Sequence, residues 1–289
     1  MNEQLKRMKR NYKNVPIPNE LDFVVKKALK QKKKNHANLM KSLAAVGVAA
    51  ILFITGINTS PAFAKALTEV PVVGPLVKVL TFTEFNVDDG MAKADIKVPA
   101  IANMENKTLE ATLNNKYLEE NKKLYNGFKE EMEELKKNGG GHVGVESGYE
   151  VKTDNDQILA IGRYVVNTVG SSSTTFKFDT IDKKNQLLIT LPSLFKDDSY
   201  IRLISENIKE QMRQQMKADP DKTYWVDDKV DFESFQSMAK DQSFYINNEG
   251  KLVISFDKYE VAPGYMGVVE FIIPTNVIVN ALVSNEYIK

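Results

Sequence analysis

Residues Leu43–Ile57 form an uncharged apolar run of 15 residues that follows a cluster of lysines. As a helix this run rises only ~22 Å, whereas a spanning helix needs about 20 residues to cross a ~30 Å hydrocarbon core. The neighbouring residues on both sides lengthen the run to a workable span. The charged Lys41 is tolerated there because its side chain can snorkel to the headgroups. We therefore predict one transmembrane helix over residues 42–60. The alternative is a buried core helix of a soluble protein, where apolar runs of about 10–14 residues are common.

The lysines lie on one side of this run only, and the charge of the whole chain is divided in the same way. Residues 1–41 contain 12 Lys and Arg against three Asp and Glu, a net +9, while the rest contains 27 basic and 35 acidic residues, a net −8. Such asymmetry indicates segments that work in different surroundings. By the positive-inside rule we expect residues 1–41 in the cytoplasm and the chain after Ile57 outside the cell. The expected location is the cell membrane, with a single pass.

Small residues follow the apolar run and resemble the site that signal peptidase reads. Both Ala62-Phe63-Ala64 and Ala64-Lys65-Ala66 have the required small-x-small pattern. A plain signal anchor with coincidental alanines explains the same residues equally well. Constitutive cleavage would give a secreted protein, whereas conditional cleavage would give a switch.

The basic tail contains one short amphipathic helix. Asn19 can cap it, Glu20 and Asp22 lie in its first turn, and lysines lie towards its end. A helix of about 12 residues is marginal alone in water, so its apolar stripe needs a partner. The stripe has helical spacing and consists of Leu21, Val24, Val25, Ala28 and Leu29.

Three partners are open for this tail. It could lie on the anionic inner leaflet, bind nucleic acid through phosphates, or dock in a groove of a protein. Nucleic acid is the weakest of these, because the tail has no recognisable motif and aromatic residues such as Tyr12 are few. Protein docking accounts for the whole tail, since Pro16 and Pro18 would divide it into two short helices. A solvated tail that only orients the protein is the remaining alternative.

Composition argues against an enzyme. The chain has no cysteine and two histidines, His36 and His142, which excludes disulfides, thiolate zinc sites and thiol nucleophiles and disfavours a histidine-based centre. The acidic pairs Asp88-Asp89, Asp197-Asp198 and Asp227-Asp228 lie in polar turns and are interpreted as solvated turn residues. We expect no cofactor and no metal.

The exported part has an α+β pattern with an antiparallel sheet and two long amphipathic helices. The first helix extends from Leu109 to Leu135 and ends at the glycine run 139–141, and the second stops before Pro220. Phe232, Phe235 and Met238 suggest a shorter third helix, and another is expected from about residue 275. Strands are predicted at about 79–87, 143–151, 158–169, 174–181, 186–191, 243–247, 251–257 and 266–273, with a hairpin turn at 247–250.

Several segments together resemble the RsiV-type anti-sigma factors, membrane receptors for lysozyme that restrain an extracytoplasmic-function sigma factor. The resemblance extends over nearly the whole chain and is most specific in its C-terminal block. The segments are 12–18, 70–74, 180–185, 193–197, 208–212 and 252–267.

This resemblance implies a mechanism and the residues that carry it. The tail would hold the sigma factor through the stripe defined above, and lysozyme would bind the exported domain. Signal peptidase would then cut after Ala66, within Ala64-Lys65-Ala66 and before Leu67, and an intramembrane protease would release the sigma factor. Lysozyme contacts would map to Pro263, Gly264, Tyr265 and the serine loop near Ser172.

The expected organisation is a sigma-binding tail at 1–41, a transmembrane helix at 42–60, a juxtamembrane segment with the cleavage site at 61–80, and a lysozyme-sensing domain at 81–289. The alternative is a membrane-tethered or secreted lysozyme inhibitor, or a wall-binding module, whose tail is only an anchor. Tyr265 beside Gly264 could also be a core tyrosine at a bend.

Overall fold

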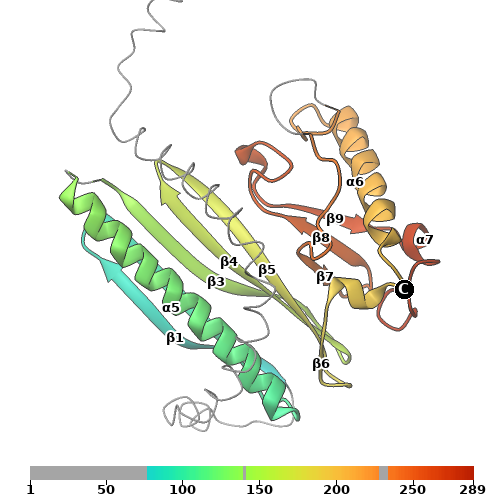
Figure 1. Cartoon of the computed structure of the whole chain (residues 1–289), viewed down its shortest axis with the longest axis horizontal. Coiled ribbons are helices and arrows are strands. Elements are labelled where there is room, and N and C mark those ends of the chain that lie inside the picture. The colour runs from blue at the N-terminus through green and yellow to red at the C-terminus, as the bar shows by residue number, and fades with distance from the viewer. Residues whose placement is uncertain (1–76, 139–140, 228–233) are drawn as a thin grey trace, which may run out of the picture. The chain divides into compact units, whose positions relative to one another are not determined.

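The computed structural model describes residues 77–138, 141–227 and 234–289, in which two β-sheets are each accompanied by helices (Figure 1). The predicted tail, the transmembrane helix over 42–60 and the cleavage site lie outside these residues. No helix of the described part combines the length and apolar character needed to cross a membrane.

The larger sheet has six strands in the order β1-β2-β3-β4-β5-β6. All neighbours are antiparallel except β2 and β3, which run parallel. That pair departs from the antiparallel sheet expected from the sequence. The helix between the two strands carries the chain back along the sheet, so that β3 begins beside the beginning of β2 and runs in the same direction. The strands are β1 (Lys78–Asp88), β2 (Ala92–Ala102), β3 (Val143–Asp154), β4 (Ile158–Val169), β5 (Ser171–Asp182) and β6 (Leu187–Ile189).

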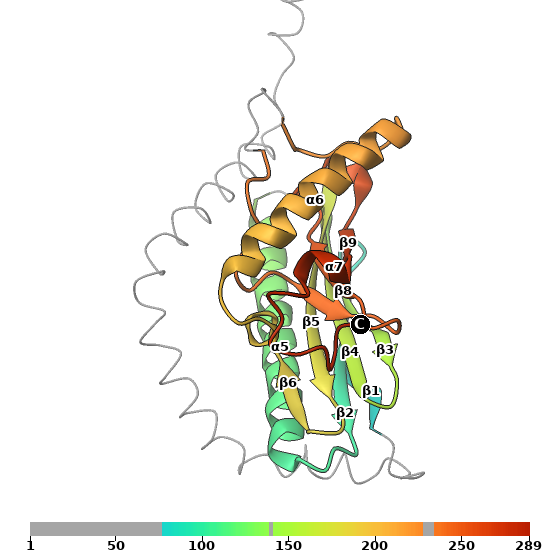
Figure 2. The same cartoon turned by 90° about the vertical axis from the view of Figure 1, so that its right-hand side faces the viewer.

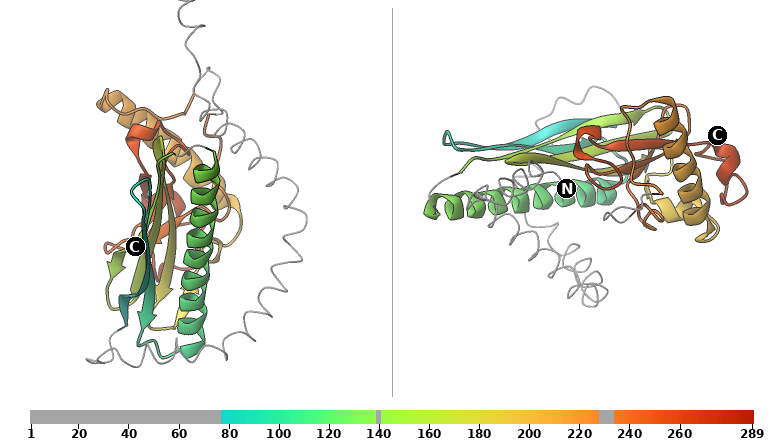
Figure 3. Two further views of the ribbon diagram at one scale, coloured as in Figure 1. Left: turned by 90° about the vertical axis from the view of Figure 1, so that its left-hand side faces the viewer. Right: turned by 90° about the horizontal axis from the view of Figure 1, so that it is seen from above.

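The connecting helix α5 (Lys107–Lys137) lies lengthwise along one face of this sheet (Figure 3). Its start is capped by the Asn106 side chain, which accepts from the backbone N–H of Leu109, and Lys136 and Lys137 complement the dipole at its end. Its buried stripe packs on apolar residues of β2, β3 and β4. The aromatic residues Tyr117 and Phe128 are therefore core residues, as the helical spacing predicts.

The smaller sheet has three antiparallel strands, β7 (Phe244–Ile246), β8 (Leu252–Phe256) and β9 (Val269–Ile273), in that order. The helices α6 (Ser199–Ala218) and α7 (Thr275–Ile278) accompany it (Figure 2). Every residue of β8 is buried, because this central strand lies inside the core formed with α6 and β9. The predicted hairpin at 247–250 is confirmed.

Two helical predictions need correction. Phe235 and Met238 lie in an irregular segment, and Phe232 lies outside the described residues. The backbone N–H of Met238 donates to Ser205 Oγ of α6 at 3.0 Å, and that of Phe235 donates to the carbonyl of Trp225. These donors are therefore not available to a helix. The expected C-terminal helix is limited to the four residues of α7.

Strand β2 was absent from the prediction. Its buried residues alternate clearly over Ala92, Ala94, Ile96 and Val98, but alanine, lysine and proline have low strand propensity and mask the pattern. The Asp89-Gly90 pair in the turn before it was the available hairpin signal. Strand β1 also begins at Lys78, inside the segment assigned to the juxtamembrane region.

The last residues of the chain return to both sheets. Leu282 bridges to Phe195, the Tyr287 hydroxyl donates to Asp182 Oδ2 at 2.7 Å, and the backbone N–H of Lys289 donates to the Gly250 carbonyl at 2.9 Å. Ile288 is buried in the core of the smaller sheet. The segment 282–289 is thus a structural part of the domain.

Candidate ligand-binding loop

Tyr265 is the most exposed large hydrophobic side chain of the described residues, with 67% of its surface accessible. It lies in the 3-10 turn η3 (Gly264–Met266), directly after Pro263. Exposure of this degree contradicts the core-tyrosine alternative and leaves the ring available to a partner. We call residues 257–267, which connect β8 with β9, the ligand loop.

The base of the ligand loop is fixed in the core. Val261 and Ala262 are buried, and the backbone N–H of Trp225 donates to the carbonyl of Val261 at 2.9 Å. The turn closes through a bond from Met266 N–H to the Pro263 carbonyl at 2.9 Å, and Gly267 leaves it at a φ of 68°. A left-handed φ favours glycine, which explains the residue at position 267.

Ser172 lies beside this loop although it is 91 positions away from Pro263 in the sequence. Lys258 Nζ donates to Ser172 Oγ at 2.9 Å, and Lys258 N–H donates to the Thr174 carbonyl at 3.0 Å. Ser172 belongs to strand β5, paired with Thr168 of β4, so the predicted serine loop is the start of a strand. The structure therefore brings the predicted Ser172 and the loop of Pro263, Gly264 and Tyr265 into one surface.

Tyr259 joins the same surface and was missed by the site prediction. Its hydroxyl hydrogen-bonds with Ser171 Oγ at 3.3 Å, and its ring lies against Gly264. The Lys258 ammonium is 5.1 Å from the centroid of that ring. Lys258 and Tyr259 are inside the 252–267 block that carries the family resemblance, but nothing in the sequence separates their roles from those of their neighbours.

Two half-buried carboxyls hold the first turn of the loop. Asp257 Oδ1 accepts from the backbone N–H of Phe176 at 2.7 Å, and Glu260 Oε2 accepts from that of Asp257 at 2.7 Å. The Gln242 amide donates to Glu260 Oε1 at 3.0 Å. Burial raises the pKa of Asp257 and the pKa of Glu260 above their ordinary values, and for Glu260 the neighbouring Asp257 charge adds to this effect. The hydrogen bonds offset part of the shift and tie the loop to β5.

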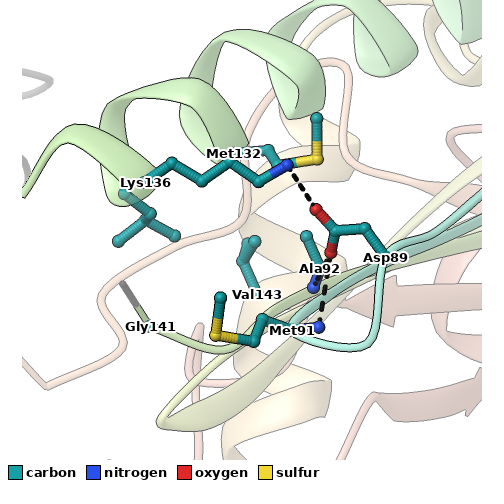
Figure 4. Close-up of a pocket in the computed structure, with 8 residues that line it drawn as sticks. Asp89, Met91, Ala92, Met132, Lys136, Gly141 and Val143 are labelled. Atoms are coloured by element: carbon teal, nitrogen blue, oxygen red, sulfur yellow. Dashed lines mark hydrogen bonds and ion pairs between the residues drawn. The ribbon is translucent and has the colours of Figure 1, made fainter. Parts of the chain in front are cut away.

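Two hollows among the described residues differ greatly in size. The first, between the β1–β2 turn and the end of α5, has a volume of about 10 Å³, roughly the room for one water molecule (Figure 4). Its polar edge is the ion pair of Lys136 with Asp89 at 2.6 Å. The second, an open groove of about 740 Å³, borders the ligand loop between segment 234–239 and the side chains of Phe256 and Glu260.

One member of each acidic pair makes a local hydrogen bond or ion pair in a turn or at a helix start, while Asp88 ends strand β1 and Asp228 lies outside the described residues. Asp89 accepts from the N–H of Ala92 in the β1–β2 turn, Asp197 accepts from the N–H of Ser199 at the start of α6, and Asp227 pairs with Arg213. Hydrogen bonds or ion pairs with these neighbours lower the pKa of all three carboxyls. Within the described ranges, no group of three or more His, Asp or Glu side chains is arranged to hold a metal ion.

A buried ionic cluster lies between α5 and the larger sheet. Arg163 of β4 donates to Asp179 of β5 at 3.1 Å and pairs with Glu120 of α5, and Lys116 contacts Asp179 Oδ1 at 2.8 Å. The guanidinium carbon of Arg163 is 4.4 Å from the centroid of the Tyr117 ring. Burial alone would raise the pKa of Asp179, but the charges of Arg163 and Lys116 outweigh it and lower that pKa. Arg163 and Asp179 are buried while Lys116 and Glu120 of α5 are partly exposed, so the cluster suits a structural role in holding α5 on the sheet.

The remaining predicted site residues lie outside the described ranges. They are the sigma-factor stripe Leu21, Val24, Val25, Ala28 and Leu29, and the cleavage residues Ala64, Ala66 and Leu67.

Comparison with known proteins identifies relatives of the fold and of the sequence. A family described as "Protein of unknown function (DUF3298)" matches residues 192–276. A crystal structure of a DUF3298 member from Bacteroides fragilis has a TM-score of 0.51 at 16% identity, and the match covers 72% of this chain and 94% of that one. A second DUF3298 structure, from Pseudomonas aeruginosa, has a TM-score of 0.47 at 12% identity, covering 75% and 98%.

Residues 192–276, which include the ligand loop, match the DUF3298 model, and the fold of the described domain is similar to that of the DUF3298 member from Bacteroides fragilis. The sequence is 48% identical over 289 residues, 100% of both chains, to a protein named anti-sigma-V factor RsiV from Bacillus subtilis (strain 168). The chain belongs to the RsiV family of anti-sigma factors.

Proposed function

We propose that this protein is a single-pass membrane anti-sigma factor whose cytoplasmic tail sequesters an extracytoplasmic-function sigma factor. The observation that carries the proposal is the 48% identity, over the full length of both chains, to a protein named anti-sigma-V factor. The apolar stripe of the basic tail would provide a face that can dock in a groove of the sigma factor. A short amphipathic helix gains its stability from the groove in which it binds.

The exported domain is proposed to sense lysozyme through the ligand loop. The exposed ring of Tyr265 and the neighbouring Pro263 offer an apolar surface to a partner on a hydrogen-bonded turn. Lys258 holds Ser172 beside them. An exposed tyrosine on an ordered loop is a typical centre of an interface. Lysozymes of the chicken type are strongly basic, so the net charge of −8 after residue 41 favours their approach at low salt.

Lysozyme binding is proposed to control proteolysis rather than any reaction of the domain itself. Signal peptidase would cut between Ala66 and Leu67 once lysozyme is bound, and an intramembrane protease would then release the tail with its sigma factor. The protein is proposed to be a regulator without enzymatic activity. The scarcity of histidine and the absence of cysteine support this.

Co-purification tests the regulatory half of the proposal. The full-length chain, tagged and extracted in mild detergent, should retain a sigma factor that is identified by mass spectrometry. A matched Val25→Asp variant, with a charge on the apolar stripe, should lose it while still inserting in the membrane. Wild-type protein that holds no sigma factor would refute the proposal and favour the tethered lysozyme inhibitor or wall-binding module, whose tail is only an anchor.

A pull-down with added lysozyme tests the sensing half. The full-length chain should capture chicken-type lysozyme, and capture should weaken as salt rises because the attraction between opposite charges is screened. A basic protein of similar size and charge that is not a lysozyme is the control. Equal capture of both proteins would mean that net charge alone accounts for the binding.

A further inference from the structure

Tyr259 has an unusual backbone for its residue type. Its φ is 71°, a left-handed conformation that among the other described non-glycine residues occurs at Asn103, Gln186 and Asp227. Short polar side chains such as Asn and Asp can stabilise this conformation by local hydrogen bonds, whereas an aromatic side chain cannot. The ring is also 47% exposed, so hydrophobic burial contributes little to keeping it there. The turn around Tyr259 is closed by a bond from Glu260 N–H to the Asp257 carbonyl at 2.9 Å, and contacts of the ring add to it.

Those contacts join three segments of the chain. A Cβ atom built on Gly264 would lie 2.2 Å from both Cε1 and Cζ of Tyr259, so the ring is seated directly on the glycine backbone. The hydroxyl at this same end of the ring also hydrogen-bonds with Ser171 at the start of β5 at 3.3 Å. The ring of Tyr259 is therefore a wedge between the start of β5 and the first residue of η3.

The seat on Gly264 matters because η3 carries Tyr265. The turn is held by short-range backbone bonds, from Met266 to Pro263 and from Gly267 to Gly264 at 3.2 Å. Tyr265 itself is exposed, so its position relative to Ser172 depends on the orientation of this turn. We infer that Tyr259 is a positioning residue: its ring, seated on Gly264, fixes the turn that presents Tyr265 to the ligand.

This inference rests on the proposed recognition of lysozyme and adds a residue to it. Binding is weakened when a loop must be ordered at the moment of association, and a loop fixed beforehand avoids that cost. The same contact explains why residue 264 is a glycine, since any side chain there would overlap the ring of Tyr259.

A double-mutant cycle on the full-length chain tests the inference, with chicken-type lysozyme as the probe and the dissociation constant and melting temperature as readouts. Tyr259→Gly should weaken binding about tenfold without lowering the melting temperature, because glycine adopts a left-handed φ freely. Gly264→Ala should also weaken binding about tenfold, because the added methyl group displaces the far end of a side chain rather than backbone. In the Tyr259→Gly background, Gly264→Ala should have little further effect, since the ring that it displaces is absent.

Tyr259→Phe is the matched control, because it keeps the ring and removes only the hydroxyl bonded to Ser171. It should bind within about threefold of wild type, as one exposed hydrogen bond contributes little. An equal effect of Gly264→Ala in both backgrounds, or wild-type affinity in Tyr259→Gly, would overturn the inference while leaving lysozyme recognition intact. A wild-type chain that does not bind lysozyme would overturn both.

Discussion

Replacing Arg163 by methionine should destabilise the domain that contains the two sheets by about 3–5 kcal/mol, the usual cost of removing one partner from a buried ion pair. Arg163 is 8% exposed and Asp179 is 3% exposed, and the guanidinium contacts Asp179, Glu120 and the Tyr117 ring together. Methionine has a similar volume and lacks charge, so the change leaves Asp179 with Lys116 as its cationic contact. For a domain of about 200 residues, this corresponds to a fall in melting temperature of ~6–20 °C.

Urea denaturation of the full-length chain gives the measurement, followed by the fluorescence of Trp225, the single tryptophan of the chain, and by circular dichroism. Lys177→Met is the control, because it removes a charge from the same cluster. Lys177 lies 3.5 Å from Glu120 with its side chain 67% exposed. An exposed pair of this kind contributes at most about 1 kcal/mol.

The pH dependence makes the test specific. The pKa of Asp179 is lowered in the folded state despite its burial, so this group contributes stability above its unfolded pKa of about 3.9, and the contribution is lost as pH falls through the folded pKa. Without Arg163, burial favours the neutral carboxyl, and protonation relieves the defect. The stability difference between wild type and Arg163→Met should therefore be largest near pH 7 and narrow as pH falls, first through the pKa of Asp179 in the variant and then through its lowered pKa in wild type. A difference no larger than that of Lys177→Met, or one unchanged over this range, would refute the reasoning.

Three further predictions concern signalling. Val25→Asp should activate a sigma-dependent reporter without lysozyme, whereas a silent reporter would exclude the stripe as the docking face. Pro263→Ala with Tyr265→Ala should weaken lysozyme binding in calorimetry with a stability change within about 0.5 kcal/mol, because the tyrosine is exposed; a large drop in melting temperature would contradict this. Ala64→Trp with Ala66→Trp should keep the receptor full length on immunoblots when lysozyme is added, while wild-type protein processed equally with and without lysozyme would reveal an ordinary signal peptide.

Elements with strong periodicity were predictable from the sequence. Helices α5 and α6 have long apolar stripes, and glycine or proline residues follow their ends. The strand pairs β4–β5 and β7–β8 follow from the residue pattern and the residues of their turns. Strand β2 was missed because its alternation is carried by alanine, whose strand propensity is low. The expected helix at Phe235 and Met238 failed because the partners of its backbone donors lie in distant segments, which local spacing cannot encode.

The family resemblance pointed to Ser172, Pro263 and Tyr265, and their role in binding stays a prediction. The structure shows that Ser172 contacts Lys258 of the loop that contains Pro263 and Tyr265, and this contact depends on the meeting of two sheets. The exposure of Tyr265 could not be derived, because an aromatic beside glycine occurs both in cores and at bends. Nothing in the neighbouring sequence indicates the left-handed backbone of Tyr259, because the contacts around its ring exist only in the folded chain.

The return of segment 282–289 to the body of the domain has a consequence for the order in which the protein matures. Tyr287 meets Asp182 across 105 positions, and Ile288 completes a core whose members extend back to Ile158. While the ribosome is still adding these residues, that core lacks one of its apolar side chains, and the donors to Asp182 and Gly250 have not been synthesised. Contacts so distant in sequence form late and slowly. The domain therefore completes its packing only after synthesis has passed these residues, and a product terminated before them lacks these contacts.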